Sequence, residues 1–389
     1  MAAAPVGYDQ AVSSWAAHLR SGGTTAWHEL APPDSPVPAL APLPDAPHLE
    51  LVRRLNLAAG PLADTLGPLA DQVWATGSPG RGRVDVPLAW PGRDHRYGSP
   101  PTEPERLPSE ELLRLATGVL VDLLPGVPIP EAEAGRRRLP LPWRRRFRLH
   151  GSPGTVAVVR RALTDRGLVE SDWRPVHVVV GRPVELMMGE LWDSATRRGG
   201  ALRWSTWWRR ARAAGRLPHQ LDLPALAGDL ARGGEPVHVV LAQTVEGAVA
   251  GAATALGATG ARVPPGRPYD AVETDLLRRL NRIAPLRGTA LPSEQLAERL
   301  SSVLAGPAAV QRPDPVACFR VPRGARAWLR ETATASAARL AEDGYAVHGD
   351  PDVLGLTEPR HRGQVDPGRT LELAVAACLL SWWAQEGRP

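Results

Sequence analysis

The chain has 389 residues, of which 43% are hydrophobic and 22% charged, so it is long enough for one large or two smaller domains with a packed core. All 46 basic residues are arginine, a bias typical of a high-GC bacterium, and the lack of lysine excludes Schiff-base enzymes, pyridoxal-phosphate enzymes and conventional P-loop NTPases, which need a Walker lysine. The net charge of +5 arises in the middle of the chain, because residues 136–216 carry 19 Arg against 6 acidic residues, whereas residues 1–135 carry 9 against 16.

The first 135 residues are predicted to form an acidic, mostly helical region. Apolar residues recur at helical spacing in three segments, 8–20, 48–59 and 110–123, the last of which Ser109 is expected to cap, and they alternate as in a strand at 83–88. A proline-rich stretch at 32–47 is expected to be an extended connector. Residues 125–142 are again rich in proline and end in a run of arginines, which predicts a domain boundary there.

Beyond this boundary, predicted strands alternate with predicted helices. The strands are 147–150, 176–180 and 237–241, and the helices that follow or separate them are 156–166, 184–196, 205–214, 223–232 and 245–256. Helical connections between strands imply right-handed βαβ units and a parallel sheet. Four further helices are predicted at 272–283, 294–304, 325–343 and 369–385. The sequence therefore predicts an α/β fold, a parallel sheet flanked by helices, with domains 1–135 and 136–389.

The turn after the first of these strands is a candidate anion site. Gly151, Ser152, Pro153, Gly154 and Thr155 lead directly into a predicted helix. Backbone N–H groups at a helix N-terminus can bind phosphate or sulfate, and glycines let the anion approach the backbone closely. The alternative is an ordinary tight turn, in which Arg182, at the end of the next strand, pairs with an acid such as Glu185 rather than with a ligand.

Residues 147–356 resemble the sulfotransferase-like P-loop family. In that family a strand leads into a loop of the type G-x-P-K-[ST]-G-[ST], which corresponds to Gly151 to Thr155 here. A second strand is followed by an Arg and a helix, as at Arg182. The resemblance implies that Gly151, Ser152, Pro153, Gly154, Thr155 and Arg182 bind the cofactor 3′-phosphoadenosine-5′-phosphosulfate, and that sulfuryl transfer is the reaction of an active member.

The same comparison shows where this sequence departs from the family pattern. The loop is about two residues short and lacks the lysine that stabilises the bridging oxygen during sulfuryl transfer. Gly189 and Glu190 stand near the position of the family's serine that binds the 3′-phosphate, and a carboxylate there repels a phosphate. His150 is the nearest candidate for a catalytic base. These departures predict a non-catalytic or catalytically altered protein that binds an anion, another ligand or a partner; the alternative is an active sulfotransferase.

Arginine and tryptophan interleave in the basic part of the chain, which suggests a third, polyanion-binding function. One group of arginines, Arg136 to Arg148, flanks Trp143, and a second, Arg197 to Arg216, surrounds Trp204, Trp207 and Trp208. These three tryptophans fall at i, i+3 and i+4, so a buried tryptophan face with solvated arginines opposite is the favoured interpretation, and nucleic acid is not the expected partner. No motif identifies a protein partner.

Cysteine and histidine form no recognisable metal motif. Cys318 and Cys378 are 60 residues apart without a CxxC spacing, and the ten histidines include no HExxH pair, so no metal site is expected. Both cysteines are predicted to be small core residues. No signal peptide and no long apolar run occurs, which predicts a cytoplasmic protein that does not enter membranes.

Overall fold

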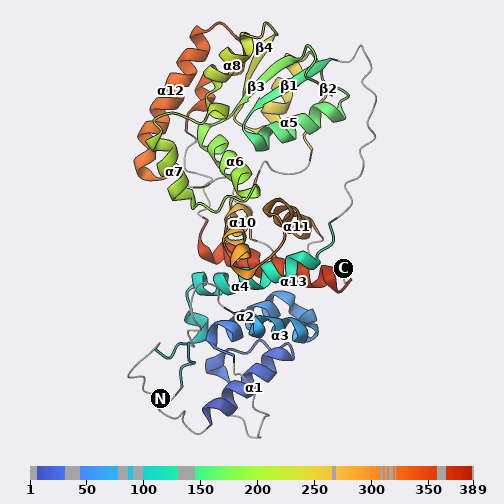
Figure 1. Ribbon diagram of the computed structural model, residues 1–389, viewed down its shortest axis with the longest axis vertical. Helices are drawn as coiled ribbons and strands as arrows, with labels where there is room; N and C mark the ends of the chain where they lie inside the picture. Colours follow the sequence, from blue (N-terminus) through green and yellow to red (C-terminus); the bar gives the residue numbers. More distant parts are fainter. Residues whose placement is uncertain are drawn as a thin grey trace. The chain divides into compact units, whose positions relative to one another are not determined.

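The computed structural model describes residues 7–30, 44–77, 86–90, 100–129, 145–264, 269–306, 310–311, 313–314, 319, 321–356 and 365–387 (Figure 1). Half of the strand expected at 83–88 (residues 83–85), the first arginine group up to Arg144, and Cys318 lie outside these residues. Among the described residues, no helix has both the length and the apolar character needed to cross a bilayer.

The chain divides into two compact units. Unit 1 comprises Met1–Glu131, Asp275–Asp314 and Asp366–Pro389, and unit 2 comprises Ala132–Thr274 and Pro315–Val365. The first division lies close to the predicted boundary at 135. The C-terminal helices differ from the prediction, because residues 275–314 and 366–389 group with the N-terminal helices rather than with the α/β part.

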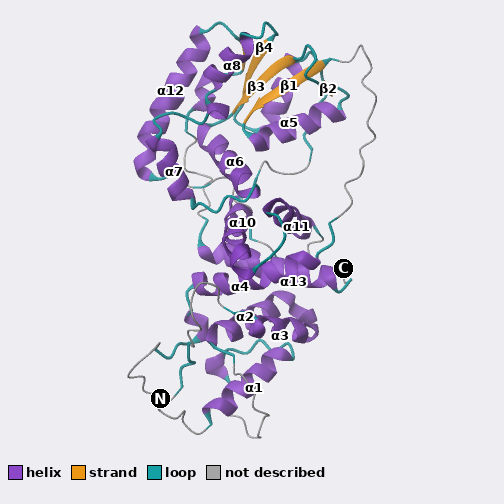
Figure 2. Ribbon diagram, viewed as in Figure 1, coloured by secondary structure: helices purple, strands orange, loops and turns teal. Residues whose placement is uncertain are grey.

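The described part of unit 1 consists of helices and their connecting loops, with an isolated β-bridge between Leu88 and Thr102 (Figure 2). Its helices are α1 (Tyr8–Arg20), α2 (Ala46–Ala59), α3 (Gly67–Ala75), α4 (Ser109–Leu123), α11 (Ser293–Ala305) and α13 (Pro367–Gln385), while α10 (Ala271–Ile283) crosses the division between the units. α13 is buried on almost every side, and it packs on α4, α2 and α11. The thiol of Cys378 lies 3.6 Å from the carbonyl oxygen of Ala116 in α4. A helix that is apolar all round needs several partners, which explains why the C-terminal helix groups with unit 1.

Unit 2 contains a five-stranded parallel sheet in the order β2-β1-β3-β4-β5, which confirms the predicted fold class. The strands are β1 (Arg146–Gly151), β2 (Val169–Glu170), β3 (Val176–Gly181), β4 (Val237–Leu241) and β5 (Ala346–His348). In the central register Gly151 pairs with Val180, and Gly181 pairs with Leu241. The two short strands β2 and β5 have no counterpart in the sequence prediction, because each offers too few residues for a periodic pattern.

Helices cover both faces of the sheet. α5 (Pro153–Asp165) and α9 (Val245–Ala255) pack on one face over Phe147, Val178 and Val240. α6 (Val184–Arg197), α8 (Leu223–Ala231) and α12 (Arg326–Glu342) pack on the other face over Val179 and Val239, and α7 (Trp204–Ala213) joins this second layer. Because neighbouring side chains of a strand point to opposite faces, the continuous valine runs of β3 and β4 supply both cores.

The strand order places a topological switch point between β1 and β3. After β1 the chain enters α5 on one face, and after β3 it enters α6 on the opposite face. In open parallel sheets of this kind, ligands bind in the crevice at the carboxyl ends of the two strands where the order reverses. The predicted anion-binding residues follow these two strand ends.

Candidate functional site

Glycine lets the chain turn sharply at the carboxyl end of β1. Gly151 has φ +133°, and a Cβ atom at this position would lie 2.4 Å from the carbonyl oxygen of Val180 on β3. The close approach of the two strands therefore requires glycine. Ser152 then forms the N-cap of α5, and Pro153 takes the first helical position, where its missing N–H costs nothing.

A carboxylate of the protein itself occupies the N-terminus of α5. Glu190, from the second turn of α6, accepts hydrogen bonds at Oε2 from the Ser152 hydroxyl (2.7 Å) and from the Thr155 backbone N–H (2.6 Å). At Oε1 it accepts hydrogen bonds from the Thr155 hydroxyl (2.7 Å) and from Arg182 Nη1 (2.9 Å). Both carboxylate oxygens are thus saturated with short donors.

The site is dry and its charges cancel. The side chain of Glu190 is 0% exposed and that of Arg182 10% exposed, while Ser152 and Thr155 are buried. The positive end of the α5 dipole and the guanidinium both stabilise a carboxylate at this point. Arg182 Nε is buried and receives no acceptor among the described residues, so the guanidinium depends on Nη1 for its contact with Glu190.

The sequence prediction brought the correct residues together but did not identify the group that they surround. Ser152, Thr155 and Arg182 converge as expected from adjacent parallel strands. Arg182 pairs with Glu190, not with Glu185 as the alternative interpretation proposed. Glu190 was identified as a residue that repels phosphate; the structure shows that its carboxylate fills the cradle.

The next turn of α6 is held by a second buried polar cluster. Asp193 Oδ1 accepts a hydrogen bond from the Thr274 hydroxyl (2.6 Å), and Arg197 donates to both Asp193 (2.9 Å) and Glu273 (2.9 Å). Burial raises the pKa of Asp193 above its ordinary value, although Arg197 opposes this shift. These contacts fix α6 and therefore the position from which Glu190 reaches α5.

His150, the candidate base, belongs to a different chain of contacts. Its Nε2 lies 2.9 Å from Nδ1 of His177, whose Nε2 lies 3.2 Å from Glu235. Burial, with contributions from His177 and Arg148, lowers the pKa of His150 to about 4. The imidazole is therefore neutral near pH 7. It lines an open surface cavity of about 460 Å³ with Arg148, Leu149, Arg160, Glu170, Ser171 and Asp172.

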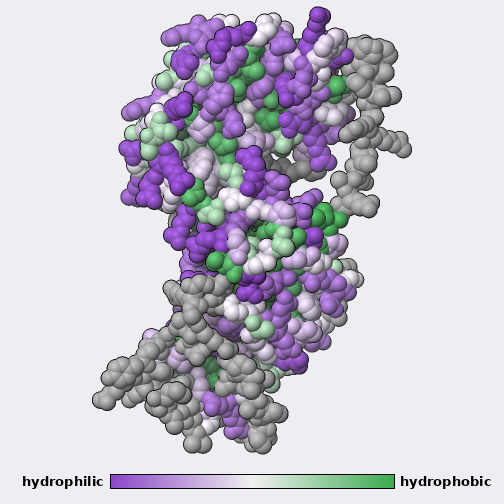
Figure 3. Space-filling model, viewed as in Figure 1, coloured by the Kyte–Doolittle hydropathy of each residue, from purple (hydrophilic) through white to green (hydrophobic). Residues whose placement is uncertain are grey.

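The tryptophans of the second Arg/Trp group point into unit 2, as the favoured interpretation predicts. Trp208 is 1% exposed, and Trp204 and Trp207 stack with 5.6 Å between ring centroids. The opposite side of α7 and the turn after it are exposed, with arginines at 203, 209, 210, 212 and 216. The visible surface over α7 and α12 is mostly hydrophilic (Figure 3). Trp173, which the sequence prediction missed, is 63% exposed and lies against Arg146.

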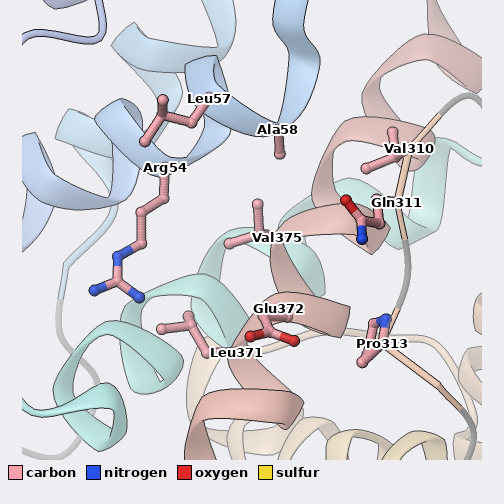
Figure 4. A pocket seen from close by; sticks show the side chains of 9 residues that line it. All are labelled: Arg54, Leu57, Ala58, Val310, Gln311, Pro313, Leu371, Glu372 and Val375. Carbon is pink, nitrogen blue, oxygen red and sulfur yellow. The ribbon is translucent and has the colours of Figure 1, made fainter.

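A further cavity of about 460 Å³ lies within unit 1 (Figure 4). Its lining is supplied by α2, α13 and the segment between α11 and unit 2, namely Arg54, Leu57, Ala58, Val310, Gln311, Pro313, Leu371, Glu372 and Val375. The guanidinium of Arg54 donates to Glu50, and the cavity offers a ligand both apolar side chains and the polar groups of Gln311 and Glu372.

Comparisons with protein-family models, with curated proteins and with solved structures find no match for this chain. The candidate site is therefore interpreted from its own geometry.

Proposed function

We propose that this protein is a sulfotransferase-like α/β protein without transferase activity, which acts by binding. The observation that carries the proposal is the Glu190 carboxylate, which occupies the position where a cofactor's phosphate or sulfate would lie. A phosphate could enter only if Glu190 left its four donors. The required lysine is also missing, so no compact ammonium is present to stabilise the leaving oxygen.

Energetics favour Glu190 over an external anion. Separating one partner from a buried, hydrogen-bonded ion pair costs about 3–5 kcal/mol. A small anion that binds with millimolar affinity gains only about 4 kcal/mol at a 1 M standard state, and less at physiological concentration. Glu190 is already tethered to α6 and loses little entropy on binding. We therefore expect Glu190 to remain in the cradle as a structural contact and small anions not to displace it.

The test is a calorimetric titration of the full chain with 3′,5′-adenosine bisphosphate. We expect no binding up to millimolar nucleotide, and no sulfuryl transfer from 3′-phosphoadenosine-5′-phosphosulfate to phenols or sugars. Micromolar affinity of the unmodified protein, or turnover above the uncatalysed rate, would contradict the proposal and favour an active sulfotransferase.

The exposed side of α7 supports a second candidate function, binding of a polyanion. None of the arginines at 203, 209, 210, 212 and 216 forms a salt bridge with a described carboxylate, so their charge is available to a partner. Binding through such side chains releases counterions and weakens steeply with salt.

Heparin chromatography tests the polyanion candidate. We expect elution at a lower salt concentration for the triple variant Arg209→Gln, Arg210→Gln, Arg212→Gln than for the unmodified chain. A matched control, Arg323→Gln with Arg326→Gln and Arg330→Gln, removes the same charge from η7 (Arg323–Ala325) and α12. Equal shifts in the two triple variants would show a general charge effect and no defined surface on α7.

A further inference from the structure

Three potential metal ligands converge in unit 1, outside the switch-point site. They are His28 in η1 (Trp27–Glu29), Glu103, and Glu105 in η3 (Pro104–Arg106). One ligand atom from each residue lies within 4.8 Å of those of the other two. His28 and Glu103 are 75 residues apart in the sequence, so no spacing motif could reveal this cluster.

Each of the two carboxylates has one buried oxygen that the described residues leave unsatisfied. Oε2 of Glu103 and Oε2 of Glu105 are both inaccessible to solvent, and neither accepts a hydrogen bond from a described residue. Two carboxylate oxygens buried near each other repel, unless a proton or a cation lies between them. The unsatisfied buried oxygens therefore point to a positively charged ligand.

Each ring nitrogen of His28 lies near a carboxylate. Nδ1 of His28 lies 3.8 Å from Oε2 of Glu105, and Nε2 lies 3.7 Å from Oε1 of Glu29. Both distances are too long for hydrogen bonds. Histidines that bind a metal through one ring nitrogen usually direct the other N–H toward a carboxylate or carbonyl, the position that Glu29 holds here.

The surrounding structure keeps the ligands in place. The Trp27 backbone N–H donates to Glu105 Oε1 (3.0 Å), and the Trp27 indole donates to the Ala89 carbonyl (2.8 Å). The indole ring also packs between Trp15 and Trp90, with centroid separations of 5.2 and 5.8 Å. One carboxylate oxygen of Glu105 is thus fixed, which aims the other at His28.

The guanidinium of Arg53 interacts electrostatically with Glu105 but makes its hydrogen bonds elsewhere. Arg53 donates to Glu50 through Nε (2.8 Å) and Nη2 (3.2 Å), and its Nη1 faces the Thr24 carbonyl oxygen. The hydrogen bonds to Glu50 raise the pKa of Arg53, and the charges of Glu105 and Glu29 raise it further. The carboxylates therefore act on Arg53 only through space, and a second cation could still neutralise their charge.

We propose that His28, Glu103 and Glu105 bind a divalent transition-metal ion. Imidazole with carboxylates suits Zn²⁺ and similar first-row ions, whereas Ca²⁺ and Mg²⁺ prefer all-oxygen sites. Two ligands about 2.1 Å from one ion and 3.8 Å apart subtend an angle of about 130°, so His28 Nδ1 and Glu105 Oε2 need only small movements. His28 is 58% exposed, and water therefore completes the coordination.

The experiment uses the metal-free full chain and Zn²⁺ alone, titrated in competition with a chelator. We expect one site that is clearly tighter than surface binding. Glu103→Gln, Glu105→Gln and His28→Gln should each weaken it at least ~10-fold, because loss of an outer-shell partner alone costs 10–100-fold. Glu29→Gln should weaken it less than these three. Two matched controls, Glu111→Gln in α4 and His219→Gln, should leave the affinity unchanged.

A second measurement protects the test against variants that fail to fold. Co²⁺ bound to the unmodified chain should give visible absorption bands of a site with fewer than six ligands, and Zn²⁺ should abolish them. A spectrum equal to that of hydrated Co²⁺ would overturn the proposal. The proposal would also be overturned if folded Glu103→Gln and Glu105→Gln variants bound Zn²⁺ as tightly as the unmodified chain, because the ion would then be bound adventitiously at the surface only. The outcome is independent of the switch-point proposal.

Discussion

Replacing Glu190 with alanine should convert a filled cradle into an anion-binding site. The substitution leaves Arg182 as a buried charge without its partner and removes the acceptor for Ser152 and Thr155. Breaking a buried ion pair from one side costs about 3–5 kcal/mol. We therefore expect the free energy of unfolding of unit 2 to fall by about this amount, measured from the urea midpoint with a signal that reports the sheet.

Small anions should restore part of this loss. Formate, acetate or phosphate can fill the space left by the carboxylate and accept the same hydrogen bonds. An anion at 100 times its dissociation constant returns about 2.7 kcal/mol. The assay compares the urea midpoints of Glu190→Ala and of the unmodified chain in sodium formate and in sodium chloride of equal ionic strength, because salts also stabilise proteins in general.

Two results would refute this reasoning. A loss below about 1 kcal/mol would show that water replaces the carboxylate at little cost, and an equal formate effect in both proteins would show that no specific site had formed. The double variant Arg182→Met, Glu190→Leu provides a control without buried charge. If the pair contributes mainly by avoiding an unpaired charge, this variant should be more stable than Glu190→Ala.

Three further predictions concern titration, reactivity and packing. The pKa of His150 is about 4 in the folded protein against an ordinary 6.5, so the unfolded chain binds more protons between these pH values and stability should fall as the pH drops from 6.5 to 4. His150→Gln should flatten this pH dependence of the urea midpoint, whereas an unchanged slope would exclude His150 as its source. Burial raises the pKa of Cys378 to about 12, so peptide mass spectrometry should find this thiol alkylated by iodoacetamide only in denaturant, and labelling of the native protein would show that α13 opens readily. Leu112 of α4 is 0% exposed, so Leu112→Ala should destabilise unit 1 by about 2–5 kcal/mol in urea unfolding, whereas the exposed Leu57→Ala should change it by less than about 1 kcal/mol.

Local patterns predicted most of the secondary structure, because the relevant forces act over a few residues. The helix expected to follow a Ser109 cap is α4, although Ser109 lies inside the helix and Pro108 is its N-cap, and the valine run expected at 176–180 is β3. Fold class followed from the alternation of these elements. α13 shows where this approach fails: its sequence indicates an apolar helix, but only long-range packing decides that it joins α4 and α2 rather than the sheet.

The candidate site was predictable in part for the same reason. Gly151 to Thr155 and Arg182 follow strand ends, and a parallel sheet brings such ends together whatever their separation in sequence. The sequence also drew attention to Glu190, but whether its carboxylate reaches the N-terminus of α5 depends on the direction of α6. The helix begins just after β3, and a residue two turns along it can reach back over the N-terminus of α5 only for one crossing angle, which the sequence does not state. The proximity of His28 and Glu103 is harder still to predict from the sequence, because irregular segments bring the two residues together.

The charge balance at the N-terminus of α5 fits a site without a lysine. A loop that binds a phosphate must balance about two negative charges, which the sulfotransferase pattern does with a lysine and backbone amides together. Here one arginine and one helix N-terminus remain, and a single carboxylate balances them. With the carboxylate in place, the charge of Arg182 is balanced and the donors of Ser152 and Thr155 are engaged, so a ligand could use these donors only by displacing a tethered group. A phosphate site would therefore need two changes at once, removal of Glu190 and addition of a cation.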